Sequence, residues 1–405
     1  MIDGMINFIK KGIQLPKAGY EFLLDERESK KYEKNSVVRW NELSFQEDRL
    51  KAIDQQLRNF KHEATPLTQA DRSLVANIHK KTSELNRNNV TRTQAYLDYY
   101  KKHPEVHWAF LAHLVSRNGG WNMTDLKGSI LDGVLSNDAR EHFFSFLERA
   151  NALIFHDAYR QLLLYEASKE RNKSLFYLLP KLDVSRFMRP FWSDFFENKN
   201  SQLLTVALII NEQHYIEKRV VHHPSFKEKV LNNIIFQLQD VLQFTYVLFP
   251  FIVKDRKLRL TGTTVSDFTN VEHRIEIGKK LYCQLFGIEN LYNDISKFAL
   301  NVQHTGSRND YWSSMFTKSR QEKLDMTSLS CRPKKPIVFS PLLENAWEDV
   351  RHSFTDESDW YQVGSEITPF FSKTKTPTSF DLTMKYCRDV HKMVVASNAM
   401  KIIKN

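Results

Sequence analysis

Apolar side chains recur every three or four residues along most of the chain, which is the spacing of one face of an α-helix. The pattern is almost continuous from about residue 65 to 316. Its longest stretch is 140–169, REHFFSFLERANALIFHDAYRQLLLYEASK, and another, 266–287, begins at a Ser-Asp cap and ends on a glycine. The pattern therefore predicts an all-α protein with a multi-helix globular body.

The segments on either side of this body differ in composition. Residues 1–64 are rich in charge and partly helical in pattern, which predicts a helical extension that packs on the body. Residues 317–340 are polar and contain proline, as a linker or long loop does. Residues 341–405 are predicted to be a C-terminal segment with two helices, SPLLENAWEDVRHSF and DLTMKYCRDVHKMVVASNAMKII. We therefore divide the chain at 1–64, 65–316, 317–340 and 341–405.

Composition supports a helical and cytoplasmic protein. Only 12 glycines and 12 prolines occur among 405 residues, too few for many tight β-turns. The longest apolar runs, LLTVALII at 203–210 and FTYVLFPFIV at 244–253, are shorter than the roughly 20 residues of a membrane span. The first residues lack the apolar core of a signal peptide. We expect no transmembrane segment and a cytoplasmic location.

The three cysteines, Cys283, Cys331 and Cys387, lie far apart and form no C-x-x-C pair. This spacing argues against a zinc ribbon and against a disulfide scaffold, as expected of a protein in the reducing cytosol.

The stretch His103–Lys127, HPEVHWAFLAHLVSRNGGWNMTDLK, places histidines and an arginine in an apolar surround. His107 and His113 lie about 120° apart around a helix, so they cannot both ligate one metal ion from this helix. Gly119 and Gly120 are expected to end the helix through a positive φ angle. Because buried polar side chains are normally hydrogen-bonded, we expect structural roles for this stretch.

Basic side chains gather on one face of the 140–169 helix. The chain carries a net charge of +10, which favours anionic partners such as nucleic acid or another polyanion. Four basic residues project within about 60° of one another: His142, Arg149, His156 and Arg160. Arginine forks and histidines in a row can bind phosphate or carboxylate groups, although the solvated face of an amphipathic helix has the same pattern. We predict a helical module that binds an anionic partner through this basic stripe.

The same helix contains the adjacent pair His156 and Asp157. This pair resembles the central signature of the HD-type metal phosphohydrolases, which are all-α. There, imidazole and carboxylate hold a divalent metal ion that activates water. Under this alternative, His156 and Asp157 are metal ligands and a divalent metal ion is the cofactor. The anion-binding hypothesis predicts no cofactor. The remaining ligands would come from His107 or His113 and from Asp183 or Asp240.

Other motifs add little. The segment NEQHYIEKRVVHHP places Glu212 on one helical face with Arg219, which predicts an ion pair. The glycine-rich phosphate-binding loops, the G-x-S-x-G elbow and the H-E-x-x-H zinc motif are all missing from the sequence. A third hypothesis is therefore a structural or scaffolding protein whose aromatic surface docks a protein partner, and whether the chain is an enzyme stays open.

Three phrases carry a resemblance to a known family: NVTRTQAYLDYYKKHPEVHWAFLAHLVSRNGGWNMTDLKG, FHDAYRQLLLYE and NEQHYIEKRV. They resemble a YppC-like domain of unknown function found in uncharacterised Bacillus-type proteins. The resemblance covers roughly residues 65 to 360. It implies a bacterial origin and implies no activity.

Overall fold

The computed structural model describes residues 22–404, except 60–65, 132–133, 227–245, 254–256, 266–267, 321–329, 332, 334 and 355–358. The described residues are predominantly helical, so the all-α prediction is confirmed. A helix covers residues 22–34. The other α-helices are α2 (Glu47–Arg58), α3 (Gln69–Leu85), α4 (Asn89–Lys102), α5 (His107–Asp125), α6 (Asn137–Glu170), α7 (Met188–Asn198), α8 (Ser201–Ile216), α9 (Pro224–Phe226), α12 (Val271–Gly287), α13 (Glu289–Asn301), α14 (Leu343–Ala346) and α15 (Thr383–Lys404). Shorter helical turns are η1 (Phe176–Leu182), η2 (Glu217–Val221), η5 (Arg308–Asp310) and η6 (Thr368–Phe371).

Polar side chains cap several helix starts, where the first backbone N–H groups have no partner within the helix. The Ser136 hydroxyl accepts a hydrogen bond from the Ala139 amide and starts α6, which confirms the long helix predicted at 140–169. Asn88 and Thr91 exchange side-chain and backbone hydrogen bonds in a capping box at the start of α4. Asn270 caps α12 in the same way as Ser136 caps α6.

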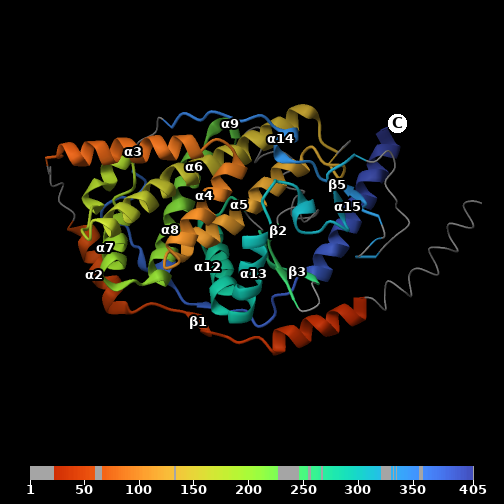
Figure 1. Ribbon diagram of the computed structural model, residues 1–405, viewed down its shortest axis with the longest axis horizontal. Coiled ribbons are helices and arrows are strands. Elements are labelled where there is room, and N and C mark those ends of the chain that lie inside the picture. Colours follow the sequence, from red (N-terminus) through yellow and green to blue (C-terminus); the bar gives the residue numbers. More distant parts are fainter. Residues whose placement is uncertain are drawn as a thin grey trace, which may run out of the picture.

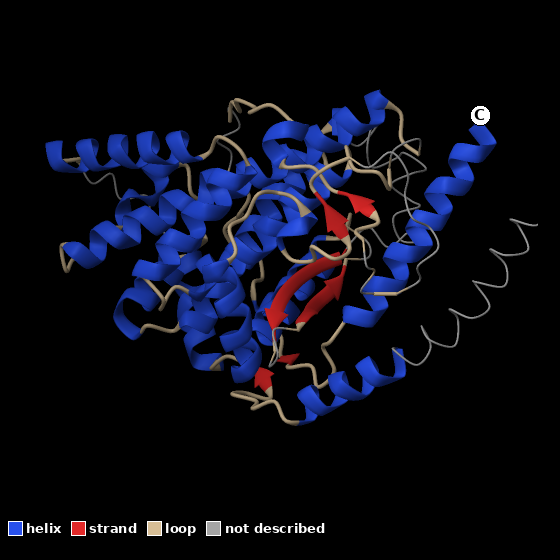
Figure 2. Cartoon of the chain, turned by 45° about the vertical axis from the view of Figure 1, so that its right-hand side comes forward, coloured by secondary structure: helices blue, strands red, loops and turns tan. Residues whose placement is uncertain are grey.

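The centre of the molecule is built from α5, α6 and α8, which pack on one another and on α4 and α12 (Figure 1). Helices α2, α3 and α7 lie at one end of the molecule and α15 lies at the other (Figure 1), and Figure 2 shows that strands make up only a small part of the fold. Leu43, Leu50 and Ile53, from the segment predicted as an extension, are buried in the same apolar core as α5 and α8. No helix in the described part of the chain combines the length and apolarity needed to cross a membrane.

One apolar run forms a strand where the sequence pattern favoured helix. The 244–253 run contains β2 (Tyr246–Ile252), which pairs antiparallel with β3 (Leu258–Thr264). Aromatic and β-branched residues suit a strand, and β2 packs between α5 and α13, so both of its faces are covered. Two further pairs are only two residues long: β1 (Glu42–Leu43) with β6 (Thr374–Lys375), and β4 (Phe316–Thr317) with β5 (Val338–Phe339).

The helix predicted in SPLLENAWEDVRHSF is mostly wrong. Only α14 is helical there, and the chain from Trp347 to Phe354 has no regular structure. The aromatic side chains of this segment pack at separate places along α6, Trp347 on Phe144 and Phe354 on His156. Tertiary packing has thus replaced local helix propensity.

Cys331 and Cys387 form a disulfide although 56 residues separate them, and Cys283 is free and buried. The sequence argument against a disulfide scaffold did not foresee this bond, because spacing alone does not show which cysteines meet in space. The bond ties the segment before β5 to α15.

Candidate functional site

The Gly119-Gly120 pair lies inside α5, which continues to Asp125, so the prediction that it ends the helix is wrong. Neither glycine has a positive φ angle. A Cβ atom on Gly120 would lie 2.3 Å from Asn89 Oδ1 and 2.5 Å from His304 Nε2. A Cβ on Gly119 would lie 2.7 Å from Asn151 Oδ1. The glycines are therefore required because polar side chains from three other elements touch the backbone of α5.

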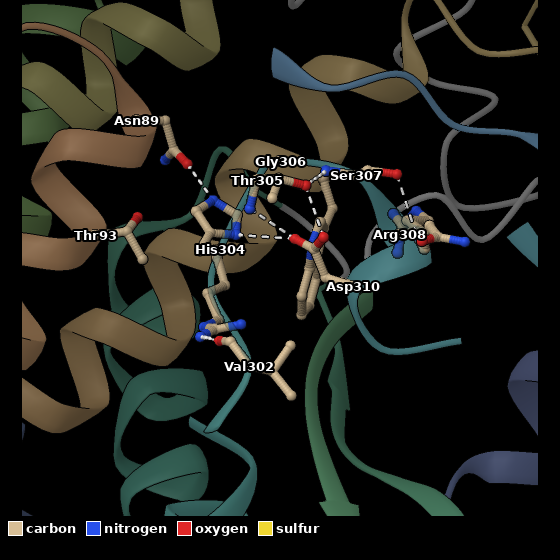
Figure 3. Close-up of polar contacts among 12 residues, drawn as sticks. Asn89, Thr93, Val302, His304, Thr305, Gly306, Ser307, Arg308 and Asp310 are labelled. Carbon is tan, nitrogen blue, oxygen red and sulfur yellow. Dashed lines mark hydrogen bonds and ion pairs between the residues drawn. The ribbon is translucent and has the colours of Figure 1, made fainter. Parts of the chain in front are cut away.

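A buried polar network surrounds this contact (Figure 3). The Asn89 amide nitrogen donates to the Ser116 carbonyl at 2.9 Å, so its oxygen accepts the 2.8 Å hydrogen bond from His304 Nε2. His304 Nδ1 lies 3.8 Å from Asp310 Oδ2. The Asp310 carboxylate also accepts hydrogen bonds from the Thr305 amide and hydroxyl, at 2.7 and 2.6 Å. The network therefore anchors the loop after α13 to α4 and α5.

His113 belongs to the same network, and both of its ring nitrogens are hydrogen-bonded. Arg117 Nε donates to His113 Nε2 at 3.0 Å, so the proton of His113 sits on Nδ1 and is donated to the Thr93 carbonyl at 2.8 Å. Burial, reinforced by Arg117, lowers the pKa of His113 well below its usual range and keeps the ring neutral. His107 faces elsewhere, 2.9 Å from the Tyr282 hydroxyl. The two histidines thus serve separate hydrogen bonds.

Replacing Gly120 tests the network. Helix propensity alone would make Gly120→Ala stabilising by about 1 kcal/mol. We expect instead a lower free energy of unfolding, by about 2 kcal/mol, because the added methyl group overlaps atoms of two buried, hydrogen-bonded side chains. Urea denaturation measures the change. Gly119→Ala is the comparison, with a smaller expected loss because only the side chain of Asn151 must shift; a stabilised Gly120→Ala would contradict the role of this contact.

Two residues of the predicted basic stripe contact the chain's own C-terminal segment. Arg149 Nη1 donates to the Ser353 carbonyl at 2.8 Å, and its guanidinium lies 4.5 Å from the ring centroid of Phe354. His156 packs on the same Phe354 ring at 4.1 Å, and burial, followed by Arg160, lowers its pKa to about 3.

The two ends of the stripe have acidic partners. Arg160 is buried and donates to Asp183 Oδ2 at 2.8 Å, and His142 Nδ1 lies 3.3 Å from Asp138 Oδ2. Each of the four side chains therefore has a contact within the described chain, while His142 and Arg149 stay partly exposed. Anion binding by the stripe stays a prediction.

The His156 and Asp157 side chains point to different partners, as their separation of about 100° around the helix requires. Asp157 Oδ2 accepts hydrogen bonds from Asn211 Nδ2 at 2.6 Å and from Gln161 Nε2 at 2.7 Å. Among the described residues, no three His, Cys, Asp or Glu side chains are close enough together to hold a metal ion. Asp240, one of the suggested ligands, lies outside the described residues. Metal binding at the pair stays a prediction, and Asp183 is the partner of Arg160.

A cavity of about 320 Å³ lies between α5, α6, α8, α12 and β2. Its wall is largely apolar and comes from all of these elements: Leu111, Ala112, Phe146, Ala150, Ile209, Val247 and Ile277. The small side chains of Ala112 and Ala150 leave this space unfilled. Val115 lines the cavity and is 37% exposed, which places it at the rim.

Glu212 of α8 is a partly buried carboxyl group that lines this cavity, as does Asp125 of α5. It accepts a hydrogen bond from Gln213 Nε2 at 3.1 Å, and the Trp108 indole lies close to it. Burial raises the pKa of Glu212 to about 8, so the carboxyl is protonated at neutral pH. The ion pair predicted with Arg219 does not form; that guanidinium lies 4.1 Å from the ring centroid of Tyr215.

Two further groups lie near this carboxyl. Tyr96 of α4 lines the cavity, and its ring centroid is 5.5 Å from that of Trp108. Its hydroxyl is buried without a hydrogen-bond partner among the described residues. Burial also raises the pKa of the neighbouring Asp157, to about 7. Sequence reasoning missed Tyr96 and the role of Glu212; the available signal was a lone acid directly after the apolar run LLTVALIIN.

Comparison with known proteins identifies the family. A family model described as "Protein of unknown function (DUF2515)" matches residues 84–386. The uncharacterized protein YppC of Bacillus subtilis (strain 168) is 38% identical over 337 residues, which cover 82% of this chain and 98% of that protein. No solved structure matches the chain. The resemblance seen in the sequence is thus confirmed, and the chain belongs to the DUF2515 family, whose function is unknown.

Proposed function

We propose that the protein binds a small, predominantly apolar molecule in the cavity between α5, α6, α8 and α12. The observation that carries this proposal is the cavity of about 320 Å³, with an apolar wall and a few convergent polar groups at Glu212. Binding sites for small molecules have this composition, and they often lie between helices.

The energetic cost of the exposed apolar wall supports the proposal. Apolar surface in contact with water is unfavourable by roughly 25 cal/mol per Å² relative to buried apolar surface, and this wall is left accessible in the cavity. Larger side chains at Ala112 and Ala150 would fill much of it. A ligand that covers this wall would offset the cost.

The test is a fluorescence titration of the purified protein with 2-ethylnaphthalene, an uncharged apolar probe. We expect saturable binding, and we expect Ala150→Phe to weaken it at least about tenfold because the new ring occupies the cavity. Ala70→Phe, on the exposed face of α3, is the matched control and should bind as the natural protein does. Ala112→Leu fills less space and keeps the test valid if Ala150→Phe does not fold. Equal binding by all four proteins would overturn the proposal.

A further inference from the structure

The two sulfur atoms of the Cys331–Cys387 disulfide differ in their surroundings. Cys387 of α15 is fully buried, whereas Cys331 is partly exposed. In thiol–disulfide exchange, a thiolate attacks one sulfur and the other sulfur leaves as a thiolate. Because Cys387 has no exposed surface, a thiolate from solvent must attack at Cys331, and Cys387 is then the leaving group.

His391 lies one helical turn after Cys387 and contacts the leaving sulfur. The carbonyl of Cys387 can only accept, so the His391 Nδ1 carries the proton that it donates to this carbonyl at 2.9 Å. The same Nδ1 lies 3.6 Å from Cys387 Sγ. A thiolate is a stronger acceptor than a disulfide sulfur, so this N–H stabilises Cys387 as the bond breaks and favours its departure.

A short chain of buried side chains connects Cys387 to the cavity. Tyr386 and Asp389, on the same turn of α15, both contact Tyr246 of β2. Asp389 Oδ2 accepts a hydrogen bond from the Tyr246 hydroxyl at 2.6 Å, and the ring centroids of Tyr386 and Tyr246 are 5.3 Å apart. β2 contributes Tyr246 and Val247 to the cavity wall. A shift of α15 therefore changes the support of this wall.

The start of α15 is anchored independently of the disulfide. The Leu382 amide donates to the Leu260 carbonyl at 2.8 Å, and the Leu260 amide donates to Thr383 Oγ1 at 2.9 Å. Asp381 forms an ion pair with Arg259 of β3 at 2.7 Å. These contacts remain when the S–S bond opens. Opening the bond thus releases the tie between α15 and the segment before β5 while the helix stays attached at its first turn.

We propose that the Cys331–Cys387 bond is a redox switch that takes small thiols at Cys331 and, when it opens, weakens ligand binding in the cavity. A thiolate forms a new S–S bond to Cys331 Sγ while the Cys331–Cys387 bond breaks and leaves its electron pair on Cys387 Sγ, which takes up a proton. A second thiol then displaces Cys331, so two thiols become one disulfide and the protein gains two thiol groups. Control of the cavity rests on the proposed function, whereas the exchange does not.

The exchange is tested on the folded natural protein with a mixture of reduced and oxidised glutathione. After acid quenching, free thiols are alkylated under denaturing conditions and the peptides are identified by mass spectrometry. We expect glutathione on Cys331 and an alkylated thiol at Cys387, with the buried Cys283 free of glutathione. Glutathione on Cys387, or exchange only at urea concentrations that unfold the protein, would overturn the proposal.

A variant of His391 tests the contact with the leaving sulfur. His391→Phe keeps a ring but removes the N–H, and we expect it to slow reduction by dithiothreitol about threefold. Lys385→Gln is the matched control, because Lys385 is a cation on the same helix that lies over the Tyr246 ring instead of at the sulfur. Equal rates for His391→Phe and the natural protein would refute the role of His391.

The effect on the cavity is measured by titrating 2-ethylnaphthalene into the oxidised and the reduced protein. We expect reduction to weaken binding about fivefold, and reoxidation to restore it, with the far-ultraviolet circular dichroism unchanged. Cys331→Ala should bind the probe as the reduced protein does and should not respond to reductant. Cys283→Ala should respond as the natural protein does.

The outcomes separate the switch from the proposed function. Exchange at Cys331 with equal probe affinity in both redox states would overturn the switch and leave the proposed function standing. A reduced protein that unfolds would also overturn the switch. If the probe binds neither state, the proposed function fails and control of the cavity fails with it.

Discussion

Glu148→Gln is expected to lower the free energy of unfolding by about 3–5 kcal/mol, because it leaves the buried charge of Arg92 without a counter-ion. The two side chains are 1% and 3% exposed and form an ion pair between α4 and α6. Asn86 accepts a further hydrogen bond from Arg92, and His352 Nε2 lies 3.3 Å from the Glu148 carboxylate. These polar partners cannot replace a full negative charge. Urea denaturation followed by circular dichroism measures the loss.

The double variant Arg92→Met with Glu148→Met is the internal control. The double variant removes both charges. Its loss of stability should therefore be much smaller than the sum of the losses measured for Arg92→Met alone and Glu148→Met alone. Glu26→Gln breaks an exposed pair with Lys30 and should change stability far less than Glu148→Gln does, because water screens the pair. A Glu148→Gln loss as small as that of Glu26→Gln would show that the buried pair contributes nothing beyond a surface pair.

Loss of the Cys331–Cys387 disulfide is the second change with a large expected effect. The bond closes a loop with a sequence separation of 56 residues. Chain-entropy arguments assign roughly 4 kcal/mol to a loop of this size, and measured values are commonly about 2–4 kcal/mol. We therefore expect Cys331→Ala to lower the free energy of unfolding by about 2–4 kcal/mol, measured without reductant.

Reduction provides the control. A dithiol reductant should destabilise the natural protein by a similar amount and should leave Cys331→Ala unchanged, because that variant has no bond to reduce. Cys283→Ala, which removes the free buried cysteine, should retain sensitivity to the reductant. Equal stability of the natural protein with and without reductant would contradict a stabilising role for the bond. Because disulfides persist mainly in oxidising compartments, the cytoplasmic location stays a prediction.

Local pattern was sufficient where an element is set by its own residues. α6 was predicted almost to its ends, because the helical repeat at 140–169 is long and unbroken. α15 was predicted for the same reason. The pattern could not distinguish a strand from a helix in 244–253, since a short apolar run that is covered on both sides has no periodicity to read.

The candidate site likewise depends on contacts between residues that are far apart in the sequence. Asp157 and Glu212 were both noticed, as a metal ligand and as an ion-pair partner. Their environment comes from other elements: Asn211 of α8 reaches Asp157, and Trp108 of α5 reaches Glu212. Tyr96 resembled any core tyrosine in the sequence, because the absence of a partner for its hydroxyl exists only in the folded chain.

The sequence by itself determined the helical class, the long central helix and the family, because helical periodicity, caps and shared phrases are local properties of the chain. The tertiary structure alone decided that His304 and Asn89 pack against Gly120, that Phe354 packs on Arg149 and His156, and that Cys331 bonds to Cys387. Each of these contacts joins residues far apart in sequence. Their energies depend on distance and burial, which a one-dimensional pattern does not contain.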